Sequence, residues 1–210
     1  MNAKLLLGVL LSLCAFCFTG CGEKDEEGYY LSPNYATATI NGEEYIYRER
    51  SLYLPRFGHY PSVESYYNDF YVGEEVIDVT PVLHIFTPLK PVNAKKENET
   101  YYELDLFIKH LDIEDISNGQ TFNFSVTSMD NLYGESHTLP FERMWRENIN
   151  IAVLQKKLDV VNSLWETTAS GSVTFSNLDK EKKSFTAVVE LKADGEEPIE
   201  LQGNIYLYYL

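Results

Sequence analysis

The chain has 210 residues, a formal net charge of −15 at pH 7 and three cysteines. Hydrophobic residues make up 44% of it and aromatic residues 14%, which excludes disordered and collagen-like chains. Its 17 basic residues are outnumbered by 32 acidic ones, and phosphate contacts require clustered lysine and arginine, so we expect no nucleic-acid partner. The composition shows no shift along the folded part, and we expect one domain.

The N-terminus predicts a secretory signal. Lys4 precedes a largely apolar run over residues 5–18, which is shorter than the about 20 residues of a membrane-spanning helix. The following Phe18-Thr19-Gly20-Cys21 resembles the bacterial lipoprotein signal, in which a cysteine after small residues is lipidated and becomes the mature N-terminus. We therefore expect a signal peptide over residues 1–20 and a lipid on Cys21. The alternative is an ordinary secretory signal with an incidental cysteine.

Cleavage before Cys21 changes the meaning of the three cysteines. Cys14 and Cys17 leave with the signal, and lipid occupies Cys21, so no cysteine remains for disulfides, metal binding or nucleophilic catalysis. The mature chain keeps 32 acidic and 16 basic residues, a net charge of −16. Its lipid supplies two acyl chains, which suffice for stable anchoring, so the first expected partner is the membrane.

Residues 22–28 form a polar run with two glycines, which cannot pack and is typical of a flexible linker. Its acidic character behind the cysteine resembles the export signal of Bacteroidetes-type surface lipoproteins. The alternative is a spacer on a periplasmic lipoprotein. We expect an outer-membrane lipoprotein at the cell surface, with a flexible acidic tether over residues 21–34 and a β domain over 35–210.

The β domain is predicted from alternating apolar and polar residues. Residues 35–40 and 43–48 flank Asn41-Gly42, the strongest short hairpin signal. Residues 102–109 also alternate, although Phe107 stands on the polar face, and residues 122–127 follow a turn at Asn118-Gly119.

The C-terminal third alternates most clearly, over residues 172–176, 185–191 and 199–209. Gly203 inside the last segment predicts a bulge or bend. One apolar and one polar face on each strand is typical of antiparallel sheet. The fold class we predict is all-β, a single antiparallel β-sandwich or β-barrel-like domain with at most one or two short helices.

Three segments do not follow this alternation. Residues 53–68 hold two prolines and several tyrosines without clear periodicity, and we interpret them as a long loop. Residues 139–165 combine strand and helix spacing, which favours a strand leading into a short helix or loop. Residues 112–117 fit one helical turn.

The segments 38–45, 111–122, 170–175, 184–187 and 201–205 carry a family resemblance. They resemble the uncharacterised surface lipoproteins common in gut Bacteroidetes, which are grouped as domains of unknown function. The shared signals are a strand, Asn-Gly and an aromatic in the first segment and turn and strand patterns in the others, and residues 52–100 lie outside the likeness. The resemblance implies fold and location and supplies no catalytic residue.

The sequence offers little catalytic chemistry. It contains no Gly-x-Ser-x-Gly motif, no phosphate-binding glycine loop and no histidine pair at metal-ligand spacing, so we expect no cofactor and name no catalytic residue. Glu103 and Asp105 share a strand face, as the two carboxylates of a hydrolase would. A weak calcium candidate is the acidic turn of Asp112, Glu114 and Asp115. The four histidines are His59, His84, His110 and His137.

Tyrosine is the unusual residue, with 16 copies. A tyrosine ring offers an apolar face and a hydroxyl, which suit contacts with sugars and with proteins. The alternative is that these rings pack on strand edges. The predicted recognition surface consists of Tyr53, Phe57, Tyr60, Tyr66, Tyr67 and Tyr71.

We therefore expect a non-catalytic lipoprotein whose β domain binds a glycan or a protein. The alternatives are a carboxylate-dependent hydrolase and a structural component of the envelope or of a surface appendage. A closed barrel with an apolar interior would add a carrier of lipid or another small molecule.

Overall fold

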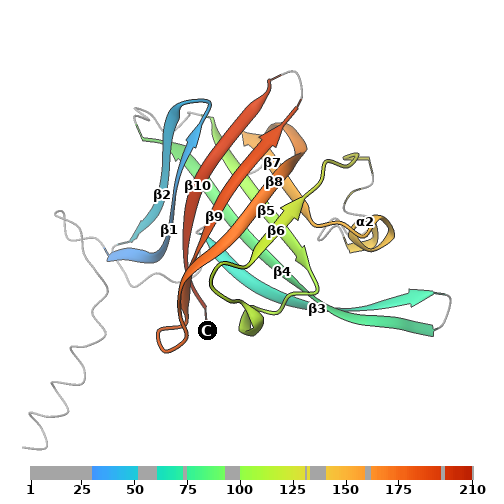
Figure 1. Ribbon diagram of the computed structural model, residues 1–210. Coiled ribbons are helices and arrows are strands. Elements are labelled where there is room, and N and C mark those ends of the chain that lie inside the picture. Colours follow the sequence, from blue (N-terminus) through green and yellow to red (C-terminus); the bar gives the residue numbers. More distant parts are fainter. Residues whose placement is uncertain are drawn as a thin grey trace, which may run out of the picture.

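The computed structural model describes residues 30–51, 61–72, 75–92, 100–130, 132, 141–158, 162–194 and 197–209. Within these ranges the chain is almost entirely antiparallel sheet (Figure 1), which confirms the predicted all-β class. The strands are β1 (Tyr30–Ile40), β2 (Glu43–Ser51), β3 (Ser62–Val72), β4 (Glu75–Pro91), β5 (Tyr101–Lys109), β6 (Thr121–Phe124), β7 (Ile151–Lys157), β8 (Ser163–Asp179), β9 (Ser184–Ala193) and β10 (Ile199–Tyr208). Two short helices accompany them, the 3₁₀ helix η1 (Ile113–Asp115) and α2 (Phe141–Glu147). No helix in this part of the chain has the length and hydropathy needed to cross a membrane.

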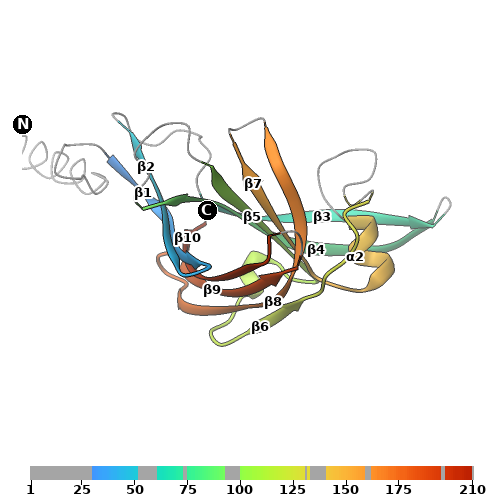
Figure 2. The ribbon, with the colours of Figure 1, turned by 90° about the horizontal axis from the view of Figure 1, so that it is seen from above.

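Eight of the described strands form a ring that closes on itself. Their order is β2-β1-β10-β9-β8-β7-β5-β4, and β4 returns to β2 where Tyr45 pairs with Pro91 and Ile46 with Lys90. Viewed from above, these strands surround a common interior (Figure 2). β3 pairs with β4 and leaves the ring as a projecting ribbon (Figure 1), and β6 lies against β8. The domain is therefore barrel-like with two additions.

The inward side chains of this ring form one hydrophobic cluster. Toward one end, Tyr102 lies between Tyr45, with ring centroids 5.5 Å apart, and Trp165 at 6.1 Å. Toward the other, Phe175 meets Phe185 edge to face at 5.4 Å. Full burial of each large apolar side chain contributes about 1.5–3 kcal/mol, so this filled interior is the main source of stability.

A second, smaller cluster lies outside the ring. Phe107 and Val82 point outward from β5 and β4, and Met144 of α2 covers them. The cluster consists of Val82, Phe107, Leu132, Met144, Ile151 and Val153. The apolar residue on the polar face of β5 is thus explained, because α2 and the segment before it shield that face from water.

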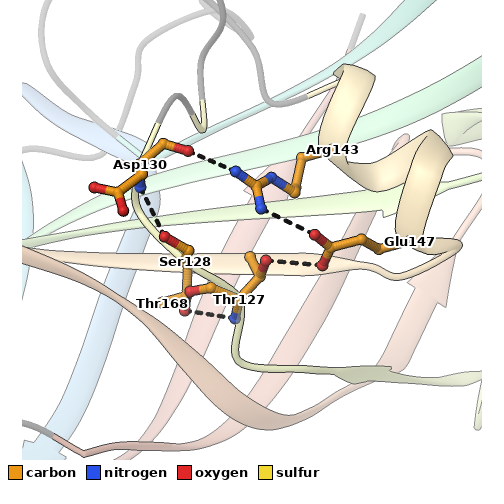
Figure 3. Close-up of polar contacts among 6 residues, drawn as sticks. All are labelled: Thr127, Ser128, Asp130, Arg143, Glu147 and Thr168. Atoms are coloured by element: carbon orange, nitrogen blue, oxygen red, sulfur yellow. Dashed lines mark hydrogen bonds and ion pairs between the residues drawn. The ribbon is translucent and has the colours of Figure 1, made fainter.

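A polar network holds α2 in place (Figure 3). The Arg143 guanidinium donates to Glu147 Oε1 at 3.0 Å and to the Asp130 carbonyl at 2.5 Å, and the Thr127 hydroxyl donates to Glu147 Oε2 at 2.8 Å. These contacts lower the pKa of Glu147, with the Thr127 hydroxyl contributing most and Arg143 next. Thr168 of β8 anchors the segment by donating to the Thr127 carbonyl at 2.6 Å.

The β1–β2 hairpin forms as predicted. Asn41 and Gly42 both adopt positive φ, 51° and 85°, as a two-residue turn of this kind requires. β1, however, begins at Tyr30, inside the segment predicted as tether. Its first residues are fixed because the buried Asn34 donates to the Pro61 carbonyl at 2.8 Å and accepts from the Tyr208 backbone N–H at 2.7 Å.

Gly203 does not form the predicted bulge, since the register of β10 is continuous with both β1 and β9. A Cβ there would lie 2.8 Å from the Thr37 carbonyl oxygen and 3.0 Å from Ala38 Cβ. The glycine instead permits β1 and β10 to approach closely.

Three further local predictions need correction. Residues 62–68 belong to β3 and not to a loop, because pairing with β4 supplies the order that their periodicity lacks. The strand of the 139–165 segment is confirmed as β7, but the helix α2 precedes it. The predicted strand over residues 122–127 is shorter than expected. It ends as β6 at Phe124, and Val126, which continues the apolar alternation, is 56% exposed. The predicted helical turn at 112–117 is confirmed as η1.

Candidate functional site

The predicted tyrosine surface is described only in part. Cys21, Tyr53, Phe57 and Tyr60 lie outside the described residues. Tyr71 belongs to β3, as do Tyr66 and Tyr67. These last two neighbours point to opposite faces of the ribbon, since side chains alternate along a strand.

Tyr66 joins a polar cluster at the base of the ribbon. Its hydroxyl donates to Glu64 Oε2 at 2.6 Å, and burial first and this carboxylate second raise the pKa of Tyr66 to about 12. Tyr66 lies 6.0 Å from the His84 ring, which stacks flat on Phe107 at 4.5 Å. His84 Nε2 is 2.7 Å from Asp105 Oδ1. A histidine held by a carboxylate suits acid–base chemistry, but this pair lines neither of the two hollows described below.

The other carboxylate considered for hydrolysis is also paired. Glu103 Oε2 lies 3.6 Å from Lys157 Nζ, and the two side chains are only 10% and 9% exposed. Lys157 Nζ also donates to Ser163 Oγ at 3.1 Å, and the Tyr101 hydroxyl donates to Glu103 Oε1 at 3.2 Å. The sequence predicts that Glu103 and Asp105 share a face, and they do, but each faces its own basic partner.

The predicted calcium residues share one turn around η1. Asp112 Oδ1 caps this turn by accepting from the Glu114 backbone N–H at 2.9 Å, and its Oδ2 accepts from the Tyr67 hydroxyl. Glu114 and Asp115 are exposed beside it. Over the described ranges, no three histidine, cysteine or acidic side chains are arranged to hold a metal ion.

The strongest candidate site is the outer surface of four adjacent strands, β2, β1, β10 and β9 (Figure 1), which we term the polar-aromatic face. Residues paired directly across strands share a face, and here they form three rows. The rows are Arg48–Tyr35–Tyr206–Thr186, Ile46–Thr37–Asn204–Val188 and Glu44–Thr39–Gln202–Glu190.

The first row contains an ordered aromatic stack. The rings of Tyr35 and Tyr206 lie parallel, with centroids 4.1 Å apart and 17° between their planes. The Arg48 guanidinium covers the Tyr35 ring at 5.0 Å and is itself fixed, because its Nε donates to the Ser32 carbonyl at 3.1 Å. Tyr35 is thus enclosed from both sides, and Tyr206 forms the end of the stack.

A hollow of about 730 Å³ opens beside this stack. Tyr206, Thr186 and Asn177 line it, and Tyr208 borders it with 45% of its surface exposed. Thr186, which pairs with Tyr206 across the sheet, has a short side chain and lines the hollow beside it. This volume falls in the range of small-ligand sites, which are about 300–1,000 Å³.

The Tyr35 hydroxyl beside this hollow is a hydrogen-bond donor at neutral pH. Partial burial and the adjacent Tyr206 raise the pKa of Tyr35, while Arg48 acts in the opposite direction. Asn177 adds an amide whose Nδ2 lies 3.4 Å from the Thr186 hydroxyl. The site offers a flat ring, hydroxyls and an amide, without a nucleophile and base in contact.

Sequence reasoning missed this site. The alternation in β1 and β10 places Tyr35 and Tyr206 on polar faces, but their contact depends on pairing two strands from opposite ends of the chain. Comparison with protein-family models, with curated proteins and with solved structures found no match.

Proposed function

We propose that this protein is a cell-surface lipoprotein of the outer membrane whose β domain binds a glycan without catalysis. The observation that carries the binding proposal is the Arg48–Tyr35–Tyr206 stack at the edge of a hollow lined by hydroxyl and amide groups. Sugars present apolar C–H faces and a rim of hydroxyls, and rigid aromatic rings beside fixed polar groups complement both.

The anchoring proposal rests on the sequence. The short apolar run, the small residues before Cys21 and the acidic segment behind it support lipidation and surface export, as does the resemblance to Bacteroidetes-type surface lipoproteins. Metabolic labelling with an alkyne fatty acid tests this: the wild-type chain takes up label, and Cys21→Ala does not. Loss of the protein to external protease on intact cells supports surface exposure, whereas protection places it on the periplasmic side.

A glycan array probed with the mature chain tests the binding proposal. We expect Tyr206→Ala to weaken capture of any bound glycan at least about tenfold, or about 1.4 kcal/mol. Tyr67→Ala is the matched control, because Tyr67 is 66% exposed on the separate β3 ribbon. Circular dichroism confirms that both variants fold.

Each other outcome contradicts the proposal in its own way. Loss of binding in Tyr67→Ala alone places recognition on the predicted tyrosine surface. An array without captured glycan, together with a stoichiometric protein complex that Tyr206→Ala disrupts, replaces the glycan with a protein ligand.

A further inference from the structure

A second hollow, of about 650 Å³, lies on the polar-aromatic face next to the first. Backbone of Ala38, Val189 and Gly203 forms its floor, since Ala38 and Val189 point their side chains into the barrel and Gly203 has none. The close approach that Gly203 permits brings β1 and β10 together beneath it. The second hollow is thus built into the sheet and is not a gap between loops.

The two hollows lie in line along the strands. Tyr35 of the first and Thr37 of the second are two residues apart on β1, and Tyr206 and Asn204 have the same relation on β10. From Gln202 to Tyr208 the strand advances by six residues, or about 20 Å, the length of a chain of about four sugar rings.

The second hollow combines apolar and hydrogen-bonding surface. Ile46 and Val92 are 42% and 49% exposed there. Because burial of apolar surface lowers the free energy, a ligand that covers these side chains would be stabilised. Its lining residues include Ile46, Val92 and Val188 beside Thr37, Gln202 and Asn204. Like the first hollow, the second is lined by both apolar and polar side chains, but it lacks the aromatic stack.

Charge selects among glycans. Glu44 and Glu190 line the second hollow, and the middle row of the face carries no charge. Two cations of this face are described: Arg48 lies at the opposite end over Tyr35, and Lys192, in the row beyond Glu190, is paired with Glu200 at 2.7 Å. An anionic sugar would approach two carboxylates, which repel it, whereas an uncharged one can accept hydrogen bonds from Asn204 and Gln202.

Resting on the proposed glycan-binding function, we infer that the two hollows are consecutive subsites for one extended, uncharged oligosaccharide lying along β10, on its β9 side. A sugar stacks at Tyr206 in the first hollow, and the chain continues over Asn204 toward Gln202 in the second. Both contacts act on one ligand, so affinity rises with chain length until both hollows are filled.

Calorimetry of the full mature chain with linear malto-, cello- and manno-oligosaccharides of two to six units tests this. We expect the affinity for the tetrasaccharide of a binding series to exceed that for its disaccharide at least about tenfold and then to level off. Val188→Tyr fills the second hollow, and it should lower tetrasaccharide affinity about tenfold while leaving disaccharide affinity within about twofold. Ser172→Tyr is the matched control on the same side of the sheet, because Ser172 pairs with Glu190 but lines neither hollow.

The failures are distinguishable. Full affinity at the disaccharide, or an unchanged tetrasaccharide affinity in Val188→Tyr, overturns the two-subsite inference and leaves glycan binding intact. Binding of uronic-acid oligosaccharides in preference to neutral ones overturns the charge selection. Absence of any glycan that depends on Tyr206 overturns the proposed function and this inference together.

Discussion

Replacement of Gly171 by alanine should destabilise the barrel strongly. Gly171 lies in β8 at a change of partner strand. Along one edge, β8 pairs with β7 as far as Ala169, and Gly171 then pairs with Phe124 of β6. Its φ is +139°, a conformation essentially restricted to glycine that costs other residues about 1–3 kcal/mol. An added Cβ would also lie 2.0 Å from the Glu190 carbonyl oxygen, and such overpacking costs about 1–3 kcal/mol more.

The sum, about 2–6 kcal/mol, is a large part of the usual 5–15 kcal/mol of folding stability. Urea unfolding followed by tryptophan fluorescence measures it. Gly119→Ala is the matched control, because Gly119 has φ +80° but no atom within 4 Å of the place that a methyl group would take, so about 1–2 kcal/mol is expected there. Equal losses of stability in the two variants would refute the assigned contact between Gly171 and the Glu190 backbone.

Two further predictions concern buried polar groups. Lys157→Met leaves Glu103 buried without its cation, and the free energy of unfolding measured in urea should fall by about 3–5 kcal/mol. The double variant with Glu103→Leu should recover most of this loss. No recovery would show that Lys157 acts through other contacts. Burial and then the neighbouring Tyr102 raise the pKa of Tyr45 to about 12, so the folded state keeps this proton while the unfolded chain loses it near pH 10. The free energy of unfolding should therefore fall between pH 10 and 12, and it should fall less in Tyr45→Phe when it is measured at these two pH values. An equal fall in the wild type and the variant would contradict this assignment.

Local patterns predict the strands but not their partners. Asn41-Gly42 and the alternation of residues 199–209 are short-range signals, and the hairpins they predict are present. The ring closes where Tyr45 pairs with Pro91, and this pairing has no local signal in the sequence. Either strand could carry the same residue pattern at the open edge of a sheet. Phe107 was the informative exception: an apolar residue on a polar strand face marks a place that another element covers, here α2.

The candidate site was harder to predict for the same reason. Tyrosines crowd residues 53–71, and this density along the chain predicts a recognition surface there. The stack of Tyr35 on Tyr206 lies elsewhere and depends on the pairing of the first described strand with the last. Residue counts along the chain therefore could not predict this stack, since an outer face of a closed sheet is assembled across strands.

Closure of the ring also bears on where a ligand can bind. An eight-stranded barrel has an interior just wide enough either to be filled by side chains or to hold one small ligand. Here the inward positions carry large residues, and Leu104, Leu106 and Phe175 are each at most 1% exposed. The apolar interior foreseen for a lipid carrier is thus taken up by the core itself, and the two hollows described above lie on the outside. Since close packing inside supplies the rigidity, the outer rows can hold tyrosine rings and amides at fixed spacing, which is what recognition of an extended ligand requires.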